Sequence, residues 1–165
     1  MNVRFEQPGD IEKIRGVNLQ AFETGTEANL VDTLRNTDLE LISLVAEENG
    51  EVIGHILFSP VTLAGDLRIM GLGPMAVIPN WQSKGVGTKL VNAGLQACEK
   101  AGYEAVVVLG HADYYPRFGF APSVNFGIKS EYDVPPEVFM VKELRKGAFK
   151  GASGTIKYHQ VFNEI

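Results

Sequence analysis

The first part of the chain alternates between short apolar runs and turn residues, a pattern that predicts a strand and two helices. Residues 3–5 form the expected strand. The segment that follows Pro8-Gly9-Asp10 has apolar side chains at helical spacing, which predicts a helix with Ile11, Ile14, Val17 and Ala21 on one face. Thr24 and Glu27 have the spacing of a capping box, a pair of side chains that bind the free N–H groups of a helix start. A second helix is therefore expected after Thr24.

The middle of the chain predicts a β-hairpin and a third, irregular strand. Asn49-Gly50 separates the apolar runs 41–47 and 52–61, and this dipeptide is a strong signal for a two-residue hairpin turn. Another strand is expected over residues 67–78. Glycine and proline inside a strand indicate a bulge or a close approach of a ligand to the backbone. This strand contains Gly71, Gly73 and Pro74.

The second half of the chain predicts a helix, a buried strand and several short elements. The helix is expected over residues 85–101, ended by Gly102, and the continuously apolar strand over residues 105–109. Together with the preceding strand they form a right-handed crossover. The short elements are a helix within 111–118 and strands around Phe126, 138–141 and 155–158. This order predicts an α/β (α+β) fold, with a mixed sheet flanked by helices, in one domain of residues 1–165.

The start of the helix at residue 85 carries unusual charge. No Asp or Glu lies between Pro79 and Cys98, and the first turns hold Lys84 and Lys89 instead. A helix N-terminus has partial positive charge and normally attracts acids. Free backbone N–H groups beside glycines suit a bound phosphate, although a glycine-rich turn with solvated lysines is the alternative. The segment is called the phosphate loop here and comprises Gln82, Ser83, Lys84, Gly85, Val86, Gly87 and Thr88.

Two common phosphate-binding motifs do not fit the phosphate loop. The P-loop motif needs Gly-Lys-Ser/Thr, whereas Gly87 is followed by Thr88-Lys89. The dinucleotide motif needs a third glycine where Leu90 stands. The pattern that fits is Gln-x-x-Gly-x-Gly after an apolar strand ending in Val-x-Pro. With this pattern, residues 1–144 resemble the GNAT superfamily of N-acetyltransferases, whose sheet is split in the middle. The C-terminal stretch resembles a subgroup of predicted acetyltransferases with unknown acceptors.

The resemblance implies a cosubstrate, acetyl-CoA, and a reaction in which its acetyl group passes directly to a primary amine. In this family the phosphate loop holds the pyrophosphate through backbone amides. The strand end formed by Met75, Ala76 and Val77 would pair with the pantetheine arm, and one amide there would polarise the thioester carbonyl. Family members commonly show Tyr, three residues and then Gly-Phe, which here selects Tyr115. Its implied role is that of a general acid that protonates the leaving CoA thiolate.

The general base cannot be selected from the sequence. Many family members carry a Glu on the strand that residues 71–77 occupy, but no acid lies there. The candidates are Glu23, Glu27, His55, His111 and Asp113, and a relayed water is equally plausible. A covalent route through Cys98 is the less favoured mechanism, because a free cysteine is usually a small core residue. Without a base, the chain would be a non-catalytic sensor that binds acyl-CoA. The acceptor amine remains open, and a homodimer is common in the family.

Composition and charge limit the kinds of partner that the chain is expected to bind. The chain has 165 residues with a net charge of −5 and no basic run, which argues against nucleic acid or an anionic membrane as partner. No apolar stretch is long enough to cross a bilayer, and the N-terminus is unlike a signal peptide. A single cysteine fits a reducing cytoplasm. The three histidines share no ligand spacing with Cys98, so no metal site is expected.

Overall fold

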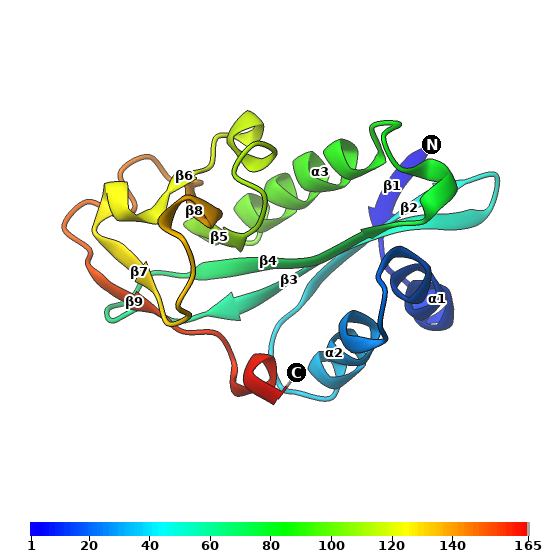
Figure 1. Cartoon of the computed structure of the whole chain (residues 1–165), viewed down its shortest axis with the longest axis horizontal. Coiled ribbons are helices and arrows are strands. Elements are labelled where there is room, and N and C mark those ends of the chain that lie inside the picture. The colour runs from blue at the N-terminus through cyan, green and yellow to red at the C-terminus, as the bar shows by residue number, and fades with distance from the viewer. Residues whose placement is uncertain (165) are drawn as a thin grey trace. The chain divides into compact units, whose positions relative to one another are not determined.

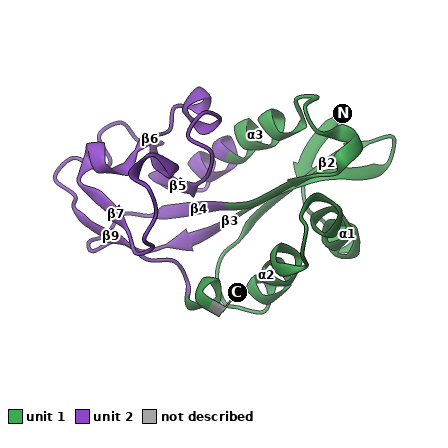
Figure 2. Cartoon of the chain, viewed as in Figure 1, with its two compact units in different colours: residues 1–58, 73–94, 160–165 green, residues 59–72, 95–159 purple. Residues whose placement is uncertain are grey.

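The computed structural model describes residues 1–164 and divides into two compact units (Figure 2). The first unit contains Met1–Phe58, Gly73–Gly94 and the C-terminal residues from Gln160, and the second contains Ser59–Leu72 and Leu95–His159. Strands β3 and β4 and helix α3 pass from one unit into the other. No helix among the described residues has both the length and the apolar character needed to cross a bilayer.

The mixed α/β fold predicted from the sequence is confirmed. The main sheet has the strand order β1-β2-β3-β4-β5-β8-β6, and β7 pairs with β9 in a second sheet. Neighbours are antiparallel in β1–β2, β2–β3, β5–β8 and β6–β8, whereas β4 and β5 are parallel, as a crossover requires. The strands are β1 (Asn2–Phe5), β2 (Ile42–Glu48), β3 (Glu51–Val61), β4 (Ile69–Val77), β5 (Ala105–Leu109), β6 (Ala121–Pro122), β7 (Ile128–Ser130), β8 (Phe139–Glu143) and β9 (Gly154–Ile156).

In the first unit, helices α1 (Ile11–Ala21) and α2 (Thr26–Arg35) lie on the face of the sheet opposite α3 (Val86–Lys100) (Figure 1). The hairpin turn forms as predicted, because Asn49 and Gly50 both adopt positive φ angles, 51° and 79°. Helix α3 packs closely at Gly94, where a Cβ atom would come within 2.3 Å of the Phe58 ring. This contact leaves no room for a larger residue at position 94.

On the predicted apolar face of α1, Ile14 and Val17 are buried, whereas Ile11, the first helical residue, is 37% exposed. One detail of the predicted helices is wrong. The capping box does not form, because α2 begins at Thr26 and its N-cap is Gly25. Thr24 therefore lies one residue too early, and its hydroxyl accepts a hydrogen bond from the Thr26 N–H instead (3.3 Å). Glu27 is consequently free of a capping role.

The second unit has its own apolar core around β5. The parallel register of β4 with β5 runs from Ile69–Ala105 to Leu72–Val108, whereas β4 itself continues to Val77. Phe126 was predicted in a strand, but it ends a 3₁₀ turn, Ser123–Phe126, because Gly127 follows with a φ of 72°. The last predicted strand is shorter than expected and ends at Ile156, after which Lys157 bridges to Thr62.

Candidate active site

The phosphate loop is shaped by two residues with left-handed backbone conformation. The N–H of Ile78 donates to the carbonyl of Ile53 (3.0 Å) and ends β4, and the 3₁₀ turn Pro79–Trp81 follows. Ser83 then has a φ of 62° and Gly85 a φ of 87°. A glycine adopts this conformation without strain, so Gly85 allows the chain to turn sharply into α3.

The phosphate loop presents a run of backbone donors that the protein does not use. The first hydrogen bond of α3 joins the N–H of Lys89 to the carbonyl of Gly85 (3.1 Å). Within residues 1–164, the six preceding N–H groups, from Ser83 to Thr88, donate to no protein acceptor. The positive end of the helix dipole adds to them, and no acid lies in the first turn. Such an array binds an anion well, which supports the prediction made from the sequence.

The side chains of the phosphate loop have different structural roles. Gln82 was predicted to bind cosubstrate, and its side-chain amide donates to the Val77 carbonyl (2.9 Å), so it ties the loop to the end of β4. Lys84 is exposed and lies 5.4 Å from the centre of the Trp81 ring. The side chain of Val86 is buried, which leaves only its backbone for a ligand. The loop therefore presents backbone N–H groups and one flexible cation.

The end of β4 keeps one backbone edge without a β-strand partner in this unit. The Ile78 N–H faces β3, and so does the Ala76 carbonyl, which lies 3.3 Å from the Cβ position of Gly54. Because a strand alternates its polar groups, the N–H groups of Met75 and Val77 point away from β3. Met75 and Val77 are two of the three residues expected to pair with the pantetheine arm, whereas the carbonyl of the third, Ala76, faces β3.

Tyr115 lies in the second unit, at the start of the 3₁₀ turn Tyr115–Phe118. Its ring is 7% exposed and passes so close to Gly110 that a Cβ atom there would be 2.3 Å from the ring. Its hydroxyl has no hydrogen-bond partner among residues 1–164. Burial, followed by the neighbouring Tyr114, raises the pKa of Tyr115 to about 12. The phenol therefore keeps its proton at neutral pH.

Tyr114 is held differently from its neighbour. The two rings meet edge to face, with centroids 5.1 Å apart. The Arg117 guanidinium lies 4.5 Å from the centre of the Tyr114 ring, and its Nε donates to the Tyr114 carbonyl (2.9 Å). Tyr114 therefore has a packing role. Pro116 lies in the first turn of the 3₁₀ helix, a position that proline tolerates.

Among the candidate bases, the structure argues against His55 and draws attention to Glu27. His55 is fully buried, and its Nε2 lies 2.9 Å from the Ser43 hydroxyl, which donates to Glu6. His55 belongs to a core network and cannot meet an acceptor. Glu27 has one buried carboxylate oxygen, Oε1, for which the described residues provide no hydrogen-bond partner. Glu23, His111 and Asp113 are exposed.

The buried position of His55 predicts a loss of stability in acid. Burial, partly offset by the charge of Glu6, lowers the pKa of His55 to about 4. Between this pH and its ordinary pKa of about 6.5, only the unfolded chain binds the proton, so stability falls as pH falls. We expect a loss of up to roughly 3 kcal/mol between pH 7 and pH 4 from this group. Urea unfolding at several pH values measures this loss in the free energy of unfolding.

Two variants isolate the contribution of His55 to acid stability. His55→Gln removes the titrating group and should flatten the pH dependence over this range. His111→Gln alters an exposed histidine and should keep the wild-type dependence. Equal slopes in the wild type and His55→Gln would contradict the assignment.

Cys98 does not offer a reactive thiolate. Its side chain is fully buried in α3, and burial raises the pKa of the thiol to about 12. A nucleophilic cysteine needs the opposite shift and access to solvent. The structure therefore argues against a covalent role for Cys98.

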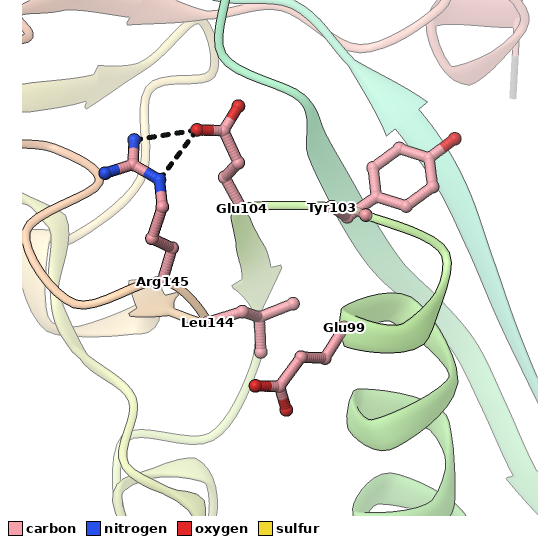
Figure 3. A pocket seen from close by; sticks show the side chains of 6 residues that line it. Glu99, Tyr103, Glu104, Leu144 and Arg145 are labelled. Carbon is pink, nitrogen blue, oxygen red and sulfur yellow. Dashed lines mark hydrogen bonds and ion pairs between the residues drawn. The ribbon is translucent and has the colours of Figure 1, made fainter.

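A cavity of about 330 Å³ lies in the second unit, near the C-terminal end of α3 (Figure 3). Two of its three charged side chains pair, since both Nε and Nη2 of Arg145 donate to Glu104 (2.9 and 2.7 Å). Glu104 also accepts from the backbone N–H of Arg68 (3.1 Å). The cavity contains none of the residues predicted for the active site and is lined by Glu99, Gly102, Tyr103, Glu104, Leu144 and Arg145.

Two residues in informative positions were not predicted from the sequence. Gly110 makes room for the ring of Tyr115, and Tyr158 lies against Gly71 in β4. The glycine just after the buried strand was the available signal for Gly110. Tyr158 had none, because its contact with β4 joins segments that are far apart in the chain.

Comparisons with known proteins identify the family to which the chain belongs. Residues 12–120 match the Acetyltransferase (GNAT) family. The chain is 36% identical to the Escherichia coli N-acetyltransferase YhbS, over the full length of both proteins. A crystal structure of YhbS in complex with CoA superposes with a TM-score of 0.94 at 35% identity, covering 98% of this chain and 91% of that one.

A second solved relative also contains the cosubstrate. This GNAT family acetyltransferase from Brucella melitensis, in complex with acetyl-CoA, has a TM-score of 0.81 and 35% identity, and the match covers 98% of this chain and 97% of that one. Full-length identity above one third and a matching family over most of the chain establish the relationship. The protein is therefore a member of the GNAT family of acetyltransferases.

Proposed function

We propose that the protein transfers the acetyl group of acetyl-CoA directly to a primary amine while both substrates are bound. The observation that carries this proposal is the run of six unused backbone N–H donors from Ser83 to Thr88, which suits the pyrophosphate of CoA. The relatives in complex with CoA and acetyl-CoA support the same cosubstrate. No metal is part of the proposal, and the buried reduced cysteine is consistent with a cytoplasmic enzyme.

We assign a group of the protein to each step of the acetyl transfer. The pantetheine arm pairs with the free edge of Met75–Val77, and one amide there donates to the thioester oxygen as negative charge develops. The amine nitrogen attacks the carbonyl carbon, a C–N bond forms and the C–S bond breaks. Tyr115 gives its proton to the departing thiolate. Glu27 takes the proton that the amine loses, a role supported by its buried carboxylate oxygen without a partner.

Removing the carboxylate of Glu27 tests the base. In Glu27→Gln we expect kcat/KM at pH 7 to fall by at least about tenfold, because a positioned base is lost. The loss should shrink as the pH approaches the pKa of the amine, where solution already supplies the neutral form. Steady-state rates from pH 6.5 to 9.5 measure this trend. Glu23→Gln is the control, and an equal loss there would reject Glu27.

A screen of amines with acetyl-CoA tests the function itself. Release of free thiol that depends on an amine, together with the acetylated product by mass spectrometry, is the expected result. Thiol release at the same rate without any amine would indicate hydrolysis instead. Tight acetyl-CoA binding with no thiol release for any amine would support the alternative, a sensor of acyl-CoA.

A further inference from the structure

Strand β1, next to the N-terminus (Figure 1), has one backbone edge without a partner, because the strand order begins with it and its only neighbour is β2. The Glu6 N–H donates to the Ser43 carbonyl (3.0 Å), so the backbone of the even-numbered residues faces β2. By the same alternation, the N–H and carbonyl of Val3 and the N–H of Phe5 point outward. Among residues 1–164, nothing pairs with these three groups.

The outer edge of β1 lacks the features that usually prevent a sheet from pairing with another strand. Free charges, prolines and bulges protect most sheet edges. The register of β1 with β2 has no shift, and β1 contains no proline. Its one charged side chain, Arg4, is already held by Asp10 (2.7 Å) and Glu47 (3.0 Å). The last strand in the order, β6, is by contrast only two residues long, and one of them is Pro122.

Apolar side chains follow one another along a single face of β1. Val3 and Phe5 share this face because side chains alternate along a strand, and Met1 precedes them at the same spacing. The side chain of Phe5 is 60% exposed and that of Met1 is 38% exposed. These three residues are called the β1 row below. The β1 row offers side chains that would pack against apolar side chains of a neighbouring strand.

From these observations we infer that two copies of the protein pair through β1, as antiparallel strands related by a twofold axis at Val3. Val3 then lies opposite the partner's Val3, and Phe5 lies opposite the partner's Met1. The Val3 N–H donates to the partner's Val3 carbonyl, and the Phe5 N–H donates to the partner's Met1 carbonyl. The β1 row thus covers a second β1 row, and a self-complementary contact of this kind closes with two copies. The inference is independent of the proposed acetyl transfer.

Charge favours this register over the neighbouring one. A twofold axis at Arg4 would place Arg4 directly opposite the partner's Arg4, and like charges opposite each other destabilise a strand pair. That register would also need the Phe5 carbonyl, which already accepts a hydrogen bond from Arg4 Nη1 (3.1 Å). An axis at Val3 places Arg4 opposite the partner's Asn2 and leaves the Phe5 carbonyl in its present contact. The axis at Val3 therefore fits both the charges and the hydrogen bonds of β1.

Sedimentation equilibrium of the full chain tests the contact. One pair of strands makes a small interface, so we expect a weak dimer that dissociates on dilution. Phe5→Lys places a cation against the partner's Met1 and should raise the dissociation constant at least about tenfold. Leu19→Lys is the control, because Leu19 is also an exposed apolar residue (45%) but lies on α1. A monomer at all concentrations up to about 1 mM, or an equal effect of the two variants, overturns the inference.

Disulfide cross-linking tests the register and does not depend on how well Phe5→Lys folds. Residues opposite each other in an antiparallel pair have Cα atoms about 4.5–5.5 Å apart, within the range of a disulfide. Val3→Cys should therefore form a covalent dimer on oxidation with diamide. Phe5→Cys should not, because position 5 lies opposite position 1 of the partner, and the native Cys98 is buried. No covalent dimer with Val3→Cys, or an equal yield with Phe5→Cys, overturns the inference.

Discussion

Replacing Gly87 by Asp is expected to abolish CoA binding while slightly raising the stability of the fold. Gly87 is the second residue of α3 and lies within the run of unused N–H donors. A carboxylate there would face the pyrophosphate, and like charges in contact cost several kcal/mol, or a loss of at least about 100-fold in affinity. The same carboxylate stabilises a helix start by roughly 0.3–1 kcal/mol. Calorimetry and thermal unfolding measure the two effects separately.

The Gly87→Asp substitution should lower the affinity for CoA but raise the stability of the fold. This difference distinguishes loss of the binding site from unfolding. Gly87→Ala is the control, since it adds a Cβ atom without charge and should lose much less affinity. Gly85→Asp is less informative, because the φ of 87° at Gly85 strains any other residue and would lower stability as well. If Gly87→Asp bound CoA with wild-type affinity, the phosphate loop would be assigned to the wrong ligand.

The second large effect is expected from Tyr115→Phe. The variant keeps the ring that packs against Gly110 and removes only the hydroxyl. We expect kcat to fall by roughly 10²-fold, the usual contribution of a general acid, with little change in acetyl-CoA affinity. Because the pKa of Tyr115 is about 12, the wild-type rate should show no decline from this group below about pH 11. Initial rates across pH and a binding titration check both statements.

Tyr114→Phe is the matched control for Tyr115. Tyr114 has the same chemistry and lies beside Tyr115, but its ring is covered by Arg117. It should keep at least most of the wild-type rate. An equal loss in both variants, or no loss in Tyr115→Phe, would show that the general acid is another group.

The features predicted correctly from the sequence depend on interactions between near neighbours in the chain. Asn49-Gly50 forms the turn because both residues tolerate positive φ angles, and this preference acts over two residues. The glycines, the lysines and the lack of acids that predict a phosphate site also lie within a few turns of one helix, and the ligand of this loop stays a prediction. The errors at Thr24 and Phe126 are also local, since each concerns where an element begins or which short element forms.

Other features depended on residues that are distant in the chain and that only folding brings together. His55 looked like a possible base until the structure buried it against Ser43 and Asn18. Glu27 became the stronger candidate because α2 begins two residues after Thr24, which removes its capping role. Tyr158 reached Gly71 through the pairing of β9 with β7 and the bridge of Lys157 to Thr62. Burial and long-range contact depend on which surfaces the whole chain can exclude from water, and no short window of sequence contains that information.

The sequence by itself thus determined the order of the elements and the acid-free, glycine-containing start of α3, because both depend on residue types at short spacing. The choice of Tyr115 over Tyr114 came from the family resemblance and stays a prediction. The tertiary structure alone decided which polar groups stay unpartnered, such as the N–H groups from Ser83 to Thr88 and the Glu27 carboxylate oxygen. It also brought Glu131 to the backbone N–H of Tyr158, 27 residues further along the chain. Whether a polar group has a partner depends on all of its neighbours in the folded structure, near or far in the chain.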